Sequence, residues 1–123
     1  MQERLPDAEL RILEALWEQG PLPAGQVAAH MKKQTGWNRN TTYTLINRLI
    51  AKNLIERSEP GFICTPLIGK EAVRRRETET LLSRLFDGSK ELFFASLLGD
   101  GNLSQDELDH LKQLLDGAES TRS

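Results

Sequence analysis

The sequence is poor in features that would point to several classes of protein. It has one cysteine, Cys64, in 123 residues, which excludes an internal disulfide and a cysteine-rich metal site. No apolar run approaches the roughly 20 residues that span a bilayer. It has no glycine-rich phosphate loop and no nucleophile motif, and its two histidines, His30 and His110, lie far apart. We therefore expect no membrane insertion, no metal or other cofactor, and no enzymatic activity.

Length and composition indicate a soluble protein with one domain, or a small domain with an appendage. Charged residues make up 28% of the sequence and hydrophobic residues 38%. These proportions are typical of a folded protein rather than a disordered one. The first residues lack the charged and then apolar pattern of a signal peptide. We therefore expect a cytoplasmic location.

The charges are unevenly distributed along the chain. The formal net charge of −2 taken alone argues against a nucleic-acid partner. Residues 31–57, however, contain six basic residues and one acidic residue, whereas residues 67–123 contain eight basic and eleven acidic residues. A local basic patch is enough to attract DNA. A chance cluster is the alternative interpretation of the same distribution.

The segment from Asn40 to Lys52 is predicted to form an amphipathic helix with Asn40 as its N-cap. At 3.6 residues per turn its apolar side chains share one face. The other face offers hydroxyl, amide, phenol and guanidinium groups but no carboxylate, although a solvated helix of a slightly acidic protein normally carries some. The apolar face consists of Leu45, Ile46, Leu49 and Ile50, and the polar face of Thr41, Thr44, Asn47 and Arg48, with Tyr43 beside them.

Side chains of this kind are the ones that contact duplex DNA. Arg and Lys neutralise phosphate charge, and Thr, Asn and Tyr hydrogen-bond to phosphates and base edges. We therefore predict a DNA-recognition helix, with further contacts from neighbouring residues. The candidate DNA-binding residues are Arg39, Asn40, Thr41, Thr42, Tyr43, Thr44, Asn47, Arg48, Lys52 and Arg57.

The first part of the chain has the succession of elements of a winged helix-turn-helix. Helices are predicted at residues 7–18, 24–33 and 40–52, and short strands at 54–57 and 62–65. The strands would form a two-stranded hairpin closed by a type II turn with Pro60 second and Gly61 third. The tip of this wing carries no basic residue, so we expect its phosphate contacts to be weak.

The second part of the chain predicts three more helices, at residues 68–86, at 89–98, and from a capping box at Ser104 and Glu107 to about Gly117. Their large apolar residues need roughly 1.5–3 kcal/mol each of burial, more than one copy can supply. We therefore predict an isologous homodimer, with packing on the winged domain of the same chain as the alternative. The candidate dimerisation residues are Leu81, Leu85, Leu92, Phe93, Leu97, Leu108, Leu111 and Leu115.

The predicted fold class is therefore mainly α. Residues 1–67 would form a winged helix-turn-helix DNA-binding domain with a small β-hairpin wing. Residues 68–117 would form a three-helix C-terminal dimerisation region, and residues 118–123 a frayed tail.

The chain as a whole resembles the penicillinase repressor family, the BlaI/MecI type of bacterial winged-helix regulators. The likeness covers residues 5–116 and is carried by three groups of residues. These are Leu10, Leu13, Leu16 and Trp17; the core Trp37, Thr41, Thr44, Leu45, Arg48 and Leu49; and Leu103-Ser104-Gln105-Asp106-Glu107.

The resemblance implies a homodimeric repressor that binds a palindromic operator in double-stranded DNA. It implies that Thr41, Tyr43 and Thr44 face base edges, with Asn40 and Arg48 nearer the phosphates. It also implies a further partner, a membrane-bound sensor metalloprotease that triggers cleavage of the repressor. A protein-interaction module without DNA binding is the alternative function. Such a module would have an apolar or acidic recognition face, and the face from Thr41 to Arg48 is neither.

Overall fold

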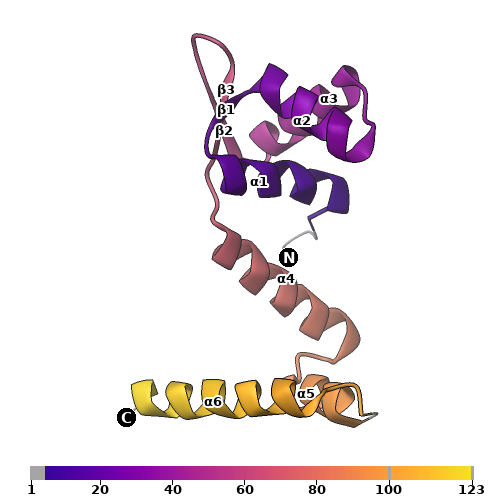
Figure 1. Cartoon of the computed structure of the whole chain (residues 1–123), viewed down its shortest axis with the longest axis vertical. Helices are drawn as coiled ribbons and strands as arrows, with labels where there is room; N and C mark the ends of the chain where they lie inside the picture. Colours follow the sequence, from indigo (N-terminus) through magenta and orange to yellow (C-terminus); the bar gives the residue numbers. More distant parts are fainter. Residues whose placement is uncertain (1–4, 100, 123) are drawn as a thin grey trace. The chain divides into compact units, whose positions relative to one another are not determined.

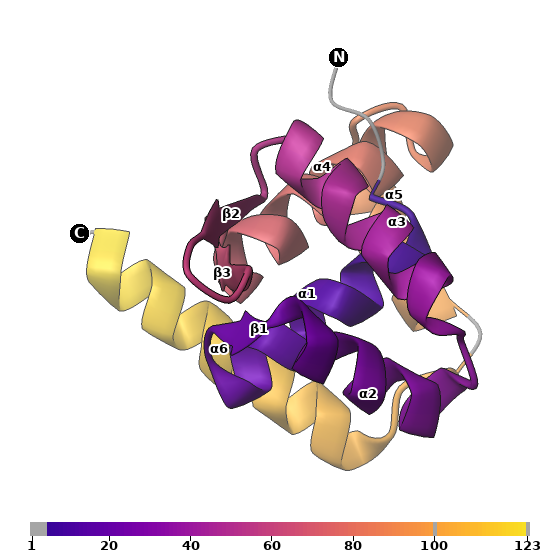
Figure 2. The same cartoon turned by 90° about the horizontal axis from the view of Figure 1, so that it is seen from above.

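In the computed structural model of the chain, three helices and a small antiparallel sheet pack together (Figures 1 and 2). Aliphatic side chains form the core between them. The structure describes residues 5–99 and 101–122, with backbone alone for residues 121 and 122. The chain divides into two compact units, one extending to Thr80 and one beginning at Leu81. The elements are α1 (Asp7–Gln19), β1 (Leu22–Pro23), α2 (Ala24–Thr35), α3 (Arg39–Ala51), β2 (Ile55–Ser58), β3 (Ile63–Pro66), α4 (Lys70–Leu85), α5 (Lys90–Gly99) and α6 (Gln105–Arg122).

The core of the first unit combines aliphatic side chains from α1, α2, α3 and the sheet. Each full burial of such a side chain contributes about 1.5–3 kcal/mol, so this cluster is the main source of stability for the unit. Val73 at the start of α4 joins the same cluster. The largest fully buried members are Ile12, Leu13, Leu16, Val27, Met31, Ile46, Leu49, Ile55 and Cys64.

The first two helices begin and end where the sequence provides the signals. α1 carries Asp7 and Glu9 in its first turn, where carboxylates suit the positive end of the helix dipole. It ends at Gly20, which has φ 81° and donates its amide to the carbonyl of Leu16 over 2.8 Å. α2 ends at Gly36 in the left-handed region, φ 80°, as is common after a helix. Both ends agree with the winged helix-turn-helix prediction.

The sheet has three strands in the order β1-β3-β2 rather than the predicted two. β1 pairs with β3, with Leu22 opposite Cys64, and β2 pairs with β3, with Arg57 opposite Cys64. The prediction missed β1 because two residues are too short to show alternation. Its Pro23, which has no amide to donate, is tolerated because β1 is an edge strand.

The turn between β2 and β3 also differs from the prediction. Gly61 has the expected positive φ of 95°, but Phe62 has a positive φ of 51° as well. The chain therefore reverses through two consecutive left-handed residues instead of the single one of a type II turn.

The N-cap of α3 is Asn38, not Asn40. The Oδ1 atom of Asn38 accepts a hydrogen bond from the backbone N–H of Thr41 over 2.8 Å. The prediction of Asn40 was wrong because the helix begins one residue earlier than expected, at Arg39, so that Asn40 lies within its first turn. Asn53, just after the helix, takes the predicted left-handed conformation, φ 61°.

The first unit extends beyond residue 67, where the sequence placed a domain boundary. The Trp17 indole donates to the Ile68 carbonyl over 2.9 Å, and Val73 is 6% exposed. These contacts tie the start of α4 to α1. The separation into units then falls within α4 itself, between Thr80 and Leu81.

The second unit confirms the predicted capping box at the start of α6. The amide of Ser104 donates to the Glu107 carboxylate over 2.9 Å, and the amide of Glu107 donates to the Ser104 hydroxyl over 3.2 Å. The bond from the Ser104 amide, and then hydrogen bonding by the Ser104 side chain, lower the pKa of Glu107.

α6 continues to Arg122, so the predicted end near Gly117 was wrong. A glycine costs about 1 kcal/mol in a helix interior, too little to end a helix whose next residues, Ala118 and Glu119, favour it. Of the predicted frayed tail, only Ser123 lies outside the described residues. None of the described helices is both long and apolar enough to cross a membrane.

One buried carboxylate connects α1 to the end of α3. Glu9 is 2% exposed, and its Oε1 atom accepts a hydrogen bond from the Lys52 ammonium over 2.8 Å. A charge removed from water needs such a partner. Lys52 therefore helps to fix α3 on α1.

Replacing Lys52 by methionine is expected to lower the free energy of unfolding by about 1–3 kcal/mol, because the Glu9 carboxylate is left buried without its cation. The measurement is urea denaturation. Lys33→Met, at an exposed lysine of α2, is the matched control and should change stability little. Equal effects of the two variants would show that the Glu9 pair contributes nothing particular.

Candidate nucleic-acid interface

α3 buries one face in the core and exposes the other. Leu45, Ile46 and Leu49 are 7%, 0% and 0% exposed, respectively. The opposite face has no carboxylate, and Tyr43 lies half-buried at its edge. Solvent, and therefore a duplex, can reach most of the predicted contact residues on this helix. The exposed ones are Arg39, Asn40, Thr41, Thr44, Asn47 and Arg48.

Thr42 does not belong to this face, and its inclusion among the DNA-binding residues was wrong. Its side chain is fully buried, and its Oγ1 atom has no hydrogen-bond partner among the residues that the structure describes. The helical period explains the position, because Thr42 precedes Leu45, Ile46 and Leu49 by three, four and seven residues. A hydroxyl there cannot reach DNA.

An aromatic corner joins the start of α3 to the wing. The Arg39 Nη2 atom donates to the Tyr43 hydroxyl over 2.9 Å, and the Arg39 guanidinium lies 4.9 Å from the centroid of the Tyr43 ring. The edge of one ring meets the face of the other between Tyr43 and Phe62, with centroids 5.8 Å apart. Tyr43 and Arg39 are therefore oriented by contacts within the protein before any ligand binds.

The wing holds its arginine in a network that we call the wing clamp, made of Arg57, Glu59 and Phe62. The Nε and Nη2 atoms of Arg57 donate to Oε1 of Glu59 over 3.1 and 2.8 Å. The amide of Phe62 donates to Oε2 of Glu59 over 3.1 Å. The Arg57 guanidinium also lies 3.7 Å from the centroid of the Phe62 ring. The Arg57 bonds and then the Phe62 amide lower the pKa of Glu59, which keeps it ionised.

Two other residues considered in the sequence analysis, Lys52 and Cys64, are held by interactions within the protein. The Lys52 ammonium bonds to Glu9, so its charge is already neutralised within the protein. Cys64 is fully buried, and burial raises the pKa of its thiol to about 11, although the charge of Arg57 partly counteracts this. A thiol that stays protonated at neutral pH is a poor nucleophile.

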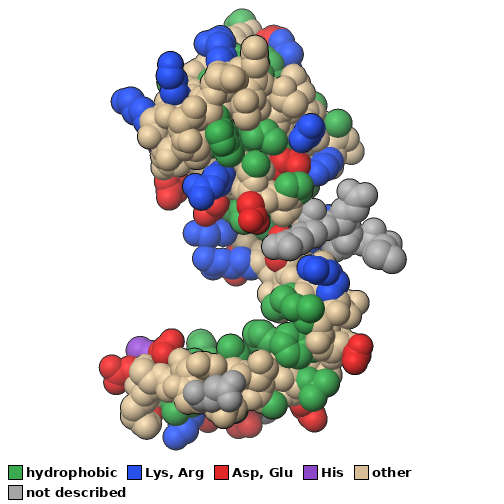
Figure 3. All heavy atoms as spheres, turned by 90° about the vertical axis from the view of Figure 1, so that its right-hand side faces the viewer, with side chains coloured by type: hydrophobic (Ala, Val, Ile, Leu, Met, Phe, Trp, Pro, Cys, Tyr) green, Lys and Arg blue, Asp and Glu red, His purple; other side chains and the backbone are tan. Residues whose placement is uncertain are grey.

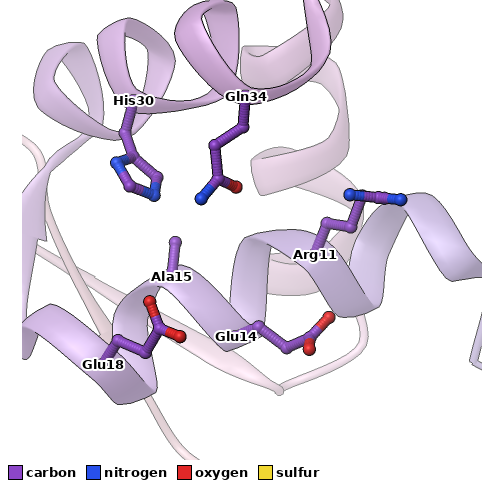
Figure 4. Close-up of a pocket in the computed structure, with 6 residues that line it drawn as sticks. All are labelled: Arg11, Glu14, Ala15, Glu18, His30 and Gln34. Carbon is purple, nitrogen blue, oxygen red and sulfur yellow. The ribbon is translucent and has the colours of Figure 1, made fainter.

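A polar hollow of about 130 Å³ lies between α1 and α2, and none of its lining residues was predicted to be functional (Figure 4). His30 and Gln34 of α2 point toward the α1 side chains across it. The Gln19 amide lies 3.0 Å from His30 Nδ1. No cluster of three or more His, Cys, Asp or Glu in the described part of the chain could hold a metal ion.

The second unit exposes many large apolar side chains (Figure 3). Of the predicted dimerisation residues, Leu85, Leu92 and Leu115 are exposed by 62%, 54% and 62%. Three further exposed residues were not predicted: Phe94 at 46%, Leu98 at 54% and Leu114 at 69%. The remaining predicted residues are half-buried within the unit, namely Leu81, Phe93, Leu97, Leu108 and Leu111.

A family model and curated relatives both place the chain with the same family of proteins. The chain matches the family model described as penicillinase repressor over residues 5–117. It is 25% identical to the penicillinase repressor of Bacillus licheniformis over 115 residues, which is 92% of this chain and 90% of that protein. It is 22% identical to the methicillin resistance regulatory protein MecI of Staphylococcus aureus over 113 residues, 90% of this chain and 92% of that protein.

A solved structure is also similar. It is the solution structure of the DNA-binding domain of the repressor BlaI, with a TM-score of 0.52 and 27% sequence identity. The likeness covers 57% of this chain and 90% of that domain. The sequence and structure comparisons thus lead to the same kind of protein.

Replacing Thr42 by valine is expected to leave the fold intact and to raise the free energy of unfolding by up to about 1 kcal/mol. Valine has nearly the same shape and removes a buried hydroxyl for which the described part of the chain provides no partner. Thermal and urea denaturation measure the effect. A loss of more than about 1 kcal/mol would show that the hydroxyl is satisfied in the folded protein.

Proposed function

The chain belongs to the penicillinase repressor family, and we propose that it is a DNA-binding transcriptional repressor that uses the exposed face of α3. The family consists of transcriptional repressors and not of enzymes. The observation that carries the proposal is the exposed row of threonine, asparagine and arginine side chains on α3, without a carboxylate, opposite a face fixed in the core. An α-helix fits the major groove of B-DNA, where each base pair presents its own pattern of donors and acceptors.

Within that proposal, each residue of the face has a role. Thr41, Tyr43 and Thr44 contact base edges, and Asn40 and Arg48 contact phosphates, as the family resemblance implies. Arg39 and Asn47 flank them, and both are exposed. The hydrogen bond from Arg39 fixes the Tyr43 phenol, which lowers the entropy lost when the ring contacts DNA.

We further propose that the second unit makes the repressor a homodimer. The support is its exposed leucines and phenylalanine, which water covers in a single copy. An isologous interface would bury the same surface on both partners. A dimer places two recognition helices roughly 34 Å apart, one turn of DNA, which suits a palindromic operator.

Release of the operator by proteolysis, downstream of a membrane-bound sensor metalloprotease, completes the proposal. Its support is the family resemblance. Cleavage in the second unit would separate apolar dimerisation surface from the unit that carries α3, and each half of the operator would then be bound alone and weakly.

Replacing Thr44 by alanine is expected to relax sequence preference, costing about 1–3 kcal/mol on the preferred duplex if the hydroxyl contacts a base. Arg48→Ala should instead weaken binding to all sequences. It should also reduce the slope of log K against log salt by the amount expected for about one phosphate contact. Fluorescence anisotropy on a duplex selected from a random library, and on its half-site variants, measures both effects.

A wild-type protein without sequence preference, and without loss of affinity as salt rises, would instead favour the protein-interaction module. If the wild type discriminates between half-sites and Thr44→Ala discriminates equally well, Thr44 has no part in base readout.

Replacing Leu115 by glutamate is expected to convert the dimer to monomers and to weaken operator binding, because a charge would enter the apolar interface. Leu115 is 62% exposed in the single chain, so the fold itself should survive. Gln113→Glu adds the same charge at an exposed position of α6 and should remain dimeric. Sedimentation equilibrium distinguishes these outcomes, and a dimeric Leu115→Glu variant would remove Leu115 from the interface.

A further inference from the structure

The wing clamp places a carboxylate on the one arginine of the wing. Arg57 and Glu59 are 48% and 55% exposed at their side chains, so both solvent and DNA can reach the pair. Two nitrogen atoms of Arg57 point at a single oxygen of Glu59, over 3.1 and 2.8 Å. These are donors that an arginine would otherwise direct at a phosphate.

Phe62 also stabilises the wing clamp. Phe62 lies under the guanidinium, and its amide donates to the second oxygen of Glu59. Its carbonyl accepts a hydrogen bond from the amide of Ala24 over 2.9 Å, which anchors the turn to the start of α2. The arrangement therefore rests on backbone as well as side chains, unlike an isolated surface ion pair.

The clamp lies beside the face of α3 proposed to bind DNA. The ring of Phe62 contacts the ring of Tyr43, and Tyr43 bonds to Arg39. A duplex bound by α3 thus comes close to Arg57, and any phosphate at the wing competes with Glu59 for the same guanidinium.

We propose that Glu59 is an affinity-lowering residue, which occupies Arg57 in the free protein and so denies duplex DNA a sequence-independent phosphate contact at the wing. This inference rests on the proposed DNA-binding function. Phosphate contacts supply most of the affinity for non-specific DNA. A carboxylate that cancels one of them weakens binding to every sequence and leaves base readout by α3 unchanged. Glu59 therefore lowers the affinity for duplex DNA as a whole and leaves the ratio of affinities between sequences unchanged.

The experiment measures binding to a random-sequence duplex over a range of salt concentrations. Glu59→Ala frees Arg57, so the slope of log K against log salt should steepen by about 0.9, and affinity at about 0.1 M salt should rise roughly fivefold to tenfold. Glu59→Gln, which keeps an acceptor for the Phe62 amide, should move both quantities in the same direction. This second variant guards against a loss of the turn.

Two controls distinguish the effect of the Arg57–Glu59 pair from the general effect of removing a negative charge. Glu56→Ala removes the same charge from an exposed position of β2, and within the described residues Arg57 forms its ion pair with Glu59 and not with Glu56. It should change affinity much less. In an Arg57→Ala background, Glu59→Ala should have little effect, because the cation that it would free is absent. Two results would overturn the inference: an equal gain in DNA affinity from Glu59→Ala and Glu56→Ala, or a full gain from Glu59→Ala in the Arg57→Ala background.

A readout without DNA separates this inference from the proposed function. NMR of the Arg57 Nε–H proton should show slow exchange with water in the wild type and fast exchange in Glu59→Ala. If the wild type binds no duplex at all, the proposed function fails and the inference fails with it. If the wild type binds DNA but Glu59→Ala leaves the slope and affinity unchanged, only the inference is overturned.

Discussion

The burial of Ile46 and Leu49 fixes the orientation of α3 within the first unit. Both side chains are fully enclosed, and each contributes about 1.5–3 kcal/mol by leaving water. Rotating the helix by half a turn would expose them and bury several amide, hydroxyl and guanidinium groups, at a cost of several kcal/mol. The polar face therefore stays outward because the apolar face cannot leave the core. The pair between Glu9 and Lys52 holds the end of the same helix.

Local rules predicted much of the fold from the sequence. The 3.6-residue period identified α3, Gly20 and Gly36 marked helix ends, and Ser104 with Glu107 specified a capping box that needs no distant residue. Residue type alone failed at Thr42, which is polar yet lies on the buried side of the helix. It also failed to choose between Asn38 and Asn40, because either side chain can cap a helix and only the backbone geometry decides.

The features that the sequence could not predict depend on contacts between separate segments of the chain. β1 is too short to show a pattern and exists only because β3 pairs with it. The wing clamp needs a turn that brings Phe62 and Glu59 back to Arg57, and the sequence indicates the turn but not its conformation. In the second unit, the sequence predicted the apolar helices correctly but not which leucines are exposed. The exposure of Leu98 and Leu114 depends on how the helices pack.

The state of Cys64 has a practical consequence for work on this protein. It is the chain's sole cysteine, it is fully buried, and its thiol stays protonated at neutral pH. A cysteine introduced on the surface would carry a reactive thiolate fraction that Cys64 lacks. Maleimide dyes would then label the introduced site selectively, without first removing a residue that the core requires. Spectroscopic distances within the protein and to bound ligands thus become accessible on an otherwise natural sequence.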